Sequence, residues 1–151
     1  MNEPTNWYTP PRLEDIWLGD DFNGPMPAQE QTWIGVDLDG TLAYEAEWRG
    51  IEFIGDPIPR MVARVKQLIA DGENVRIFTA RASHLQSEEE REIAIQYIEA
   101  WCEKHIETRL PVTNEKDHFL KYFLDDRAIS VVCNKGIEVS AGTIKPLRIE
   151  T

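Results

Sequence analysis

The stretch WIGVDLDGTLA, residues 33–43, determines how the rest of this sequence is interpreted. It begins with a short, mostly apolar run, which is typical of a strand buried inside a sheet. Two aspartates, Asp37 and Asp39, follow one residue apart, and Gly-Thr comes directly after them. The pattern therefore predicts two carboxylates at the carboxyl end of a buried strand.

The next segments predict a loop and a helix. Residues 41–55 alternate loosely, which favours a small hairpin or flap. Asp56 and Pro57 then suit the N-cap and the first residue of a helix, and Gly72 suits its end. The helix has one apolar stripe, formed by Ile58, Met61, Val62, Val65, Leu68 and Ile69.

A second round of the same pattern follows. NVRIFTAR, residues 74–81, predicts a buried strand, and Ser87 with Glu90 predicts the capping box of a helix over residues 87–105. We expect the apolar stripe of that helix to comprise Ile93, Ala94, Tyr97, Ile98, Trp101, Cys102 and His105. The later runs LPVTN, KYFLDD and ISVVCN predict short strands. Strands that alternate with helices predict a three-layer α/β/α Rossmann-like sandwich with a central parallel sheet.

Composition sets limits on the class of protein. The chain has 151 residues, which suits a single domain, and we expect it over residues 31–151, after an irregular extension over residues 1–30. The net charge of -11 disfavours nucleic acid polymers as partners. No run is long enough to span a bilayer and no signal peptide is visible, so a cytoplasmic location is expected. Cys102 and Cys133 are expected to be reduced, buried thiols.

Acidic residues recur at the strand ends. Asp125 and Asp126 end the strand YFLDD, just as Asp37 ends the first one. Ligands of open parallel sheets bind at the carboxyl ends of the strands, so these acids should converge. Crowded carboxylates repel each other unless a cation neutralises them, and Mg²⁺ is the usual oxygen-bound cation beside phosphate. Capping or turn roles remain the simpler interpretation for any one of these acids alone.

Other ligand motifs are missing or do not fit. An EF-hand requires its glycine at the sixth loop position, whereas Gly40 is fourth from Asp37. The sequence contains neither a Walker loop nor GxGxxG. P-loop nucleotide hydrolysis and dinucleotide binding therefore have no support.

Together these motifs resemble those of the haloacid dehalogenase-like (HAD) phosphohydrolase superfamily. GVDLDGTLA is similar to its first motif and RIFTAR to its second; Lys116 is similar to its third and YFLDDRA to its fourth. The form DDR resembles that of deoxyribonucleotidases and polynucleotide 3'-phosphatase domains.

The resemblance implies a role for each matching residue. Asp37 would be the nucleophile that forms an aspartyl-phosphate, and Asp39 the general acid and base. Mg²⁺ would bind Asp37, the backbone carbonyl of Asp39 and Asp126, with Asp126 favoured over Asp125 as the direct ligand. Asp125 would then orient Lys116 or a bound water.

The phosphoryl group would be held by a second set of residues. The resemblance implies hydrogen bonds from Thr79 and contacts with Ala80 and Arg81, while Lys116 would offset charge in the transition state. The backbone N–H of Leu38 and that of Asp39 are further donors. Arg81 could equally be part of a structural ion pair, as could Arg127.

The expected function is a Mg²⁺-dependent phosphatase without a cap domain, because neither gap between the motifs has room for one. A phosphorylated small molecule, a nucleotide or a nucleic-acid end is the expected substrate. Tyr44, Trp48 and Phe53 of the flap could stack on a base or pack onto the body. Residues 1–30 could form a lid or join a homo-oligomer.

Several alternatives remain open at this stage. A binding or regulatory module that has lost turnover, a phosphatase of a protein or sugar phosphate, and a phosphomutase share the same fold. His84 could face the site, whereas His105 and His118 have no evident partner and are expected to be structural.

Overall fold

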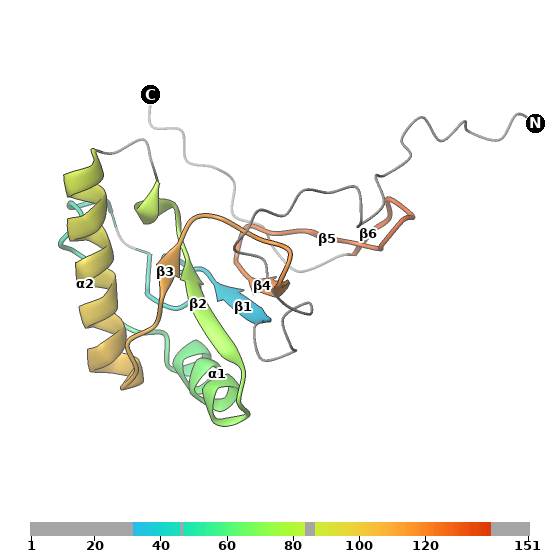
Figure 1. Ribbon diagram of the computed structural model, residues 1–151, viewed down its shortest axis with the longest axis horizontal. Helices are drawn as coiled ribbons and strands as arrows, with labels where there is room; N and C mark the ends of the chain where they lie inside the picture. The colour runs from blue at the N-terminus through green and yellow to red at the C-terminus, as the bar shows by residue number, and fades with distance from the viewer. Residues whose placement is uncertain (1–31, 46, 84–86, 140–151) are drawn as a thin grey trace, which may run out of the picture.

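A four-stranded parallel sheet forms the centre of the protein. The structure, a computed structural model, describes residues 32–45, 47–83 and 87–139, so the predicted extension over residues 1–30 and His84 lie outside the described residues. The sheet has the order β3-β2-β1-β4 (Figure 1). Its strands are β1 (Trp33–Val36), β2 (Asn74–Phe78), β3 (Val112–Thr113) and β4 (Leu120–Leu124). The predicted α/β sandwich with a central parallel sheet is confirmed.

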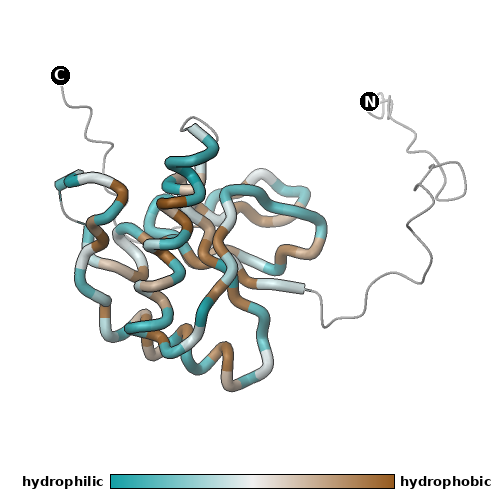
Figure 2. Tube along the Cα trace, turned by 60° about the vertical axis from the view of Figure 1, so that its left-hand side comes forward, coloured by the Kyte–Doolittle hydropathy of each residue, from teal (hydrophilic) through white to brown (hydrophobic). Residues whose placement is uncertain are grey.

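Helices α1 (Pro59–Ala70) and α2 (Glu88–Ile106) pack on the same face of the sheet. The register pairs Ile34 with Val75, so these side chains point to one face, toward Val65 of α1 and Ile98 of α2 in the shared core. A right-handed crossover from β1 to β2, followed by one from β2 to β3 in the same direction, requires this placement. Brown and teal residues alternate along the trace in Figure 2, as expected for elements with one buried face.

In the described part of the chain, the opposite face of the sheet is covered by a connecting segment and not by a helix. The connection from β3 to β4 returns across that face as a short irregular segment, residues 114–119, rather than as a helix. The indole N–H of Trp33 donates to Asp117 at 2.8 Å, and this bond lowers the pKa of the Asp117 carboxyl. Phe123 stacks on Phe78 with ring centroids 4.3 Å apart. The third layer of the sandwich is therefore formed here by a connection and by aromatic side chains.

The start of α1 differs from the prediction. Asp56 and Pro57 were expected to begin the helix, but Ile58 is the N-cap and Pro59 the first helical residue. The reason lies in tertiary hydrogen bonds: the N–H of Ile58 donates to Leu42, and Pro57 forms a bridge with Ala43. Residues 56–58 are thereby held extended.

The other helix ends follow their sequence signals. The N–H of Gly72 donates to Ile69 and that of Glu73 to Leu68, which forms a Schellman motif around a positive φ of 85° at Gly72. Ser87 caps α2 by accepting from the N–H of Glu90 at 3.2 Å. The predicted stripe of α2 is wrong at two positions, since Ile93 and Tyr97 are exposed and Ile106 is buried instead.

Of the hairpin or flap predicted over residues 41–55, the structure has the flap: residues 44–45 and 47–56, here called the flap, form a loop whose two ends lie together. The N–H of Tyr44 donates to Asp56 at 2.7 Å, which joins the two ends of the flap. The indole of Trp101 donates to the carbonyl of Gly55 at 3.0 Å and fixes this neck to α2. The flap thus has a defined attachment, and its described residues form no strand.

The predicted strand ISVVCN is not part of the parallel sheet. Its β5 (Ser130–Val131) pairs with β6 (Glu138–Val139) in a separate antiparallel sheet. Cys133 lies in the connecting turn and is exposed, so the expectation of two buried thiols is wrong for it, while Cys102 is buried. Both cysteines are free. Among the described residues, no helix has the length and apolar character required to cross a membrane.

Candidate active site

The carboxyl ends of β1 and β4 bring three aspartates together, as predicted. Asp37, Asp125 and Asp126 each offer a carboxylate oxygen within 4.8 Å of the other two. The pairing of the strands explains this convergence, because Val36 lies opposite Leu124 and the N–H of Asp37 donates to the Leu124 carbonyl at 2.9 Å. We call these residues the acid trio.

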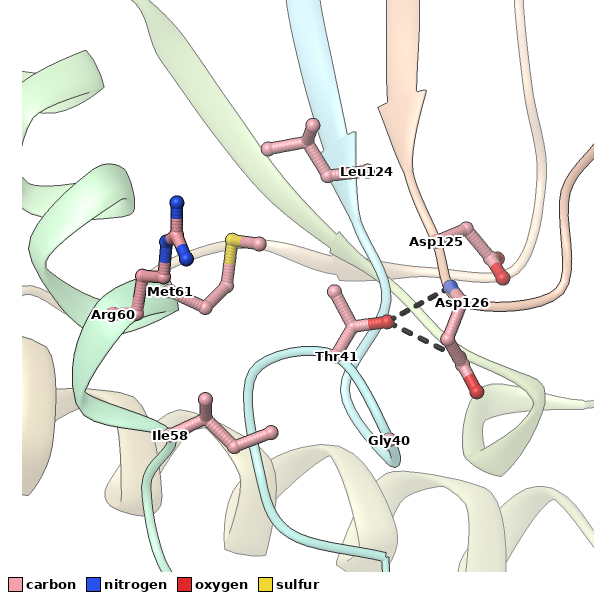
Figure 3. A pocket seen from close by; sticks show the side chains of 8 residues that line it. All are labelled: Gly40, Thr41, Ile58, Arg60, Met61, Leu124, Asp125 and Asp126. Atoms are coloured by element: carbon pink, nitrogen blue, oxygen red, sulfur yellow. Dashed lines mark hydrogen bonds between the residues drawn. The ribbon is translucent and has the colours of Figure 1, made fainter. Parts of the chain in front are cut away.

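Thr41 links the two halves of the acid trio. Its hydroxyl donates to Asp126 Oδ1 at 3.1 Å and accepts from the Asp126 N–H at the same distance (Figure 3). The same Oγ1 lies 3.4 Å from Asp37 Oδ2. No role for Thr41 was predicted from the sequence. Its position four residues after Asp37, in the turn that follows the strand, was the feature that could have indicated a contact with the acids.

Gly40 allows the close approach of this turn to β4. Its φ is 86°, and a Cβ built on it would lie 2.7 Å from Asp126 Oδ2. Any other residue would meet both the backbone penalty of the left-handed region and a collision with a carboxylate. The DGT sequence is therefore matched to the position of Asp126.

The acid trio is electrostatically crowded. Burial, assisted by the hydrogen bond to Asp126 and by the charges of Asp125 and Asp126, raises the pKa of Asp37 from 3.8 to about 8. A carboxyl with this pKa is protonated at neutral pH and is a poor nucleophile. A cation among the three carboxylates would reverse that effect, and an all-oxygen donor set suits Mg²⁺. The residues present therefore fit the metal that the sequence predicted.

Thr79 lies at the same edge of the sheet. Val36 pairs with Ile77, so Thr79, two residues further on, comes beside Leu38 at the end of β1. Thr79 is buried, and its hydroxyl accepts from the N–H of Arg81 at 3.2 Å. Ala80 and Arg81 belong to one turn of 3-10 helix, Ala80–Ala82, that follows β2 directly. The second predicted motif thus lies where the phosphoryl group was expected.

Asp39 is not part of the acid trio. Both of its carboxylate oxygens are bound by Arg81, from Nε at 2.7 Å and from Nη2 at 2.8 Å. The Arg81 side chain is only 8% exposed. The sequence left open whether Arg81 binds substrate or forms an ion pair, and the structure shows the ion pair.

Arg81 still has capacity for a further contact. Its Nη1 is buried and has no hydrogen-bond partner among the described residues. Buried donors in folded proteins almost always have a partner, which can be a protein atom, an ordered water or a ligand, so an acceptor is expected here. The guanidinium also lies 4.9 Å from the centre of the Trp48 ring.

Among the described residues, neither the Lys116 nor the Arg127 side chain forms an ion pair with the acid trio, although the backbone N–H of Arg127 donates to Asp125 Oδ1 at 2.7 Å. Lys116 is exposed on the connection that precedes β4, and among the described residues it forms no ion pair with the three aspartates. Arg127 makes a 3.4 Å contact with Glu45 of the flap. Of the cationic side chains predicted to act at the site, that of Arg81 forms an ion pair with one of its carboxylates, Asp39.

A pocket of about 390 Å³ borders the acid trio on the side of α1. Asp125 and Asp126 form its polar wall, and Ile58, Met61 and Leu124 form its apolar wall (Figure 3). Arg60 stands at the first turn of α1 beside it. The site thus combines carboxylates, an adjoining cavity and one buried guanidinium.

Comparison with known proteins adds little to this description. No protein-family model matches the chain, and no curated protein matches it. One solved structure, of a conserved protein from Bacteroides thetaiotaomicron, is 25% identical in sequence and has a TM-score of 0.43; the match covers 63% of this chain and 75% of that one.

Proposed function

We propose that the protein is a Mg²⁺-dependent phosphomonoester hydrolase that works through an aspartyl-phosphate at Asp37. The single observation that carries this proposal is the acid trio, because three carboxylates within 4.8 Å at the ends of two parallel strands are unfavourable without a cation. The order of the HAD-like motifs along the chain supports the same conclusion. A phosphorylated small molecule, with a nucleotide preferred over a nucleic-acid end, remains the proposed substrate.

Each residue contributes a defined step. Bound Mg²⁺ would supply charge neutralisation between the attacking carboxylate and the phosphoryl group. Asp37 attacks phosphorus, the P–O bond of the ester breaks, and the leaving oxygen takes up a proton. Thr79 and the backbone N–H groups that follow Asp37 hold the phosphoryl oxygens. Water then attacks the acyl phosphate and regenerates Asp37.

Asp39 is the proposed source of the proton. Each of its oxygens accepts one hydrogen bond from Arg81 and keeps a further lone pair, which is available for a proton that passes to the leaving oxygen. The same Asp39 removes a proton from the attacking water in the second step.

The test is hydrolysis of p-nitrophenyl phosphate and a panel of phosphorylated metabolites, with Mg²⁺ and with EDTA. Asp37→Asn should lower kcat by about three orders of magnitude or more, as expected when a nucleophile is lost. Glu103→Gln, an exposed acid on α2, is the matched control and should keep full activity. Mass spectrometry of a quenched reaction should find the phosphoryl group on the peptide that contains Asp37. Equal rates in Asp37→Asn and the wild type would contradict the mechanism.

The alternative of a silent binding module is favoured by one observation, the occupation of Asp39 by Arg81. It predicts that the wild type hydrolyses no member of the panel in Mg²⁺, yet still binds Mg²⁺ through the acid trio. Isothermal titration with Mg²⁺, beside the activity panel, separates the two functions.

A further inference from the structure

The three aromatic residues of the flap have different surroundings. Trp48 is 64% exposed, and its ring lies over the guanidinium of Arg81. Tyr44 is similarly exposed, at 66%, and Phe53 is instead covered by Arg49. Trp48 is therefore the flap aromatic that is connected to the candidate site.

A short chain of contacts joins Trp48 to the proposed general acid. Arg81 lies 4.9 Å from the ring centre of Trp48 and binds Asp39 at 2.7 Å. A general acid must come within hydrogen-bond reach of the leaving oxygen. The group attached to that oxygen consequently lies beside Arg81 and the exposed indole.

The pocket beside α1 is less suited to the leaving group of the substrate. Its lining includes Asp125 and Asp126 but neither Asp39 nor Trp48. A leaving group placed there would be next to the acids that are proposed to hold the metal. The leaving group could therefore bind in this pocket or on the surface beside Arg81 and Trp48. The position of Asp39 favours the surface beside Arg81 and Trp48.

The Trp48 indole is also positioned to stack on a planar group of a ligand. Its contact with the cation of Arg81 occupies part of the ring system, and the large exposed fraction leaves surface for a second planar group. The neck of the flap is fixed by the Tyr44–Asp56 and Trp101–Gly55 hydrogen bonds, which limits the motion of the ring. A pre-positioned aromatic surface loses little conformational entropy when a ligand stacks on it.

We propose that Trp48, whose ring packs against the Arg81 guanidinium, is the specificity-determining residue for the leaving group. It selects phosphomonoesters whose leaving group carries a planar ring, such as nucleoside monophosphates. The inference rests on the proposed function. The buried Nη1 of Arg81, which lacks a partner in the described part of the chain, is the donor available to an acceptor on the same ligand. The overall charge of -11 favours a mononucleotide over a polymer.

The experiment compares adenosine 5'-monophosphate with ribose 5-phosphate, because both release a primary sugar hydroxyl and differ in the base. Trp48→Ala should lower the ratio of kcat/KM for the nucleotide to kcat/KM for ribose 5-phosphate about tenfold, the order of magnitude of one base–aromatic stack. Trp48→Phe should retain most of the preference. Tyr44→Ala removes an equally exposed ring from the same flap and should preserve it fully.

Measurements of equilibrium binding test the role of Trp48 without requiring the protein to hydrolyse the ligand. Dissociation constants for the two ligands in Mg²⁺ should show the same loss of preference in Trp48→Ala, whether or not the chain hydrolyses them. Equal effects of Trp48→Ala on both ligands, or no effect on either, would overturn the inference while leaving the phosphatase proposal intact. Absence of hydrolysis with a Trp48-dependent preference in binding would overturn the phosphatase proposal alone.

Discussion

The raised pKa of Asp37 makes the metal-free protein sensitive to pH in a way that one substitution isolates. The folded-state pKa, about 8, lies above the ordinary value of 3.8, so the folded protein retains a proton that the unfolded chain releases. The stability associated with this proton is fully present below pH 3.8 and is lost as the pH rises through 8. We therefore expect the metal-free protein to become less stable between these values.

The size of this change in the free energy of unfolding follows from the shift in the pKa of Asp37. At about 1.4 kcal/mol per pH unit, the rise in pKa corresponds at face value to about 6 kcal/mol. The Asp37 side chain is only partly buried, and screening by solvent reduces this figure to about 2 kcal/mol. Mg²⁺ at about one hundred times its dissociation constant would restore about 2.7 kcal/mol.

The assay is urea unfolding at pH 5 and pH 8, in EDTA and in Mg²⁺. Between these two pH values the wild type should lose about 1 kcal/mol more than Asp37→Asn, because the amide carries no titrating proton and this interval covers only part of the pH range over which the stability is lost. Mg²⁺ should stabilise the wild type at pH 8 and have little effect on the variant. Glu103→Gln removes an exposed acid far along α2 and should behave like the wild type. The same pH dependence in Asp37→Asn as in the wild type would refute crowding at the acid trio as its cause.

Two further predictions concern the turn beside the acid trio and the cysteines. Gly40→Ala and Gly72→Ala introduce a side chain at nearly the same φ, 86° and 85°, but a Cβ meets Asp126 at Gly40 and nothing within 4 Å at Gly72. Both variants should lose about 1 kcal/mol of stability from backbone strain, and Gly40→Ala alone should lose its response to Mg²⁺ in thermal unfolding. A thiol reagent at pH 8 should modify one cysteine per native chain, since Cys133 is exposed, whereas burial raises the pKa of the Cys102 thiol to about 12. Mass spectrometry before and after denaturation checks this, and rapid native modification of Cys102 would contradict it.

Local patterns were sufficient to predict much of the fold. The N-cap at Ser87 and the end of α1 at Gly72 depend on hydrogen bonds between near neighbours, and the structure confirms both. The start of α1 was mispredicted because Ile58 and Pro57 are held by Leu42 and Ala43, across the neck of the flap. A capping signal cannot compete with hydrogen bonds that the sequence pattern does not reveal.

The sequence by itself predicted that acids at the strand ends would meet, although it counted Asp39 among them. Parallel strands place their carboxyl ends at one edge, so Asp37, Asp125 and Asp126 converge once the strands are identified. Only the tertiary structure decided the partners of the other site residues. It paired Asp39 with Arg81, placed Trp48 over that guanidinium, and left Lys116 exposed on the connection before β4. The physical reason is that local periodicity reveals the strands and the acids at their carboxyl ends, whereas the direction of a side chain on a loop depends on contacts with residues distant in the sequence.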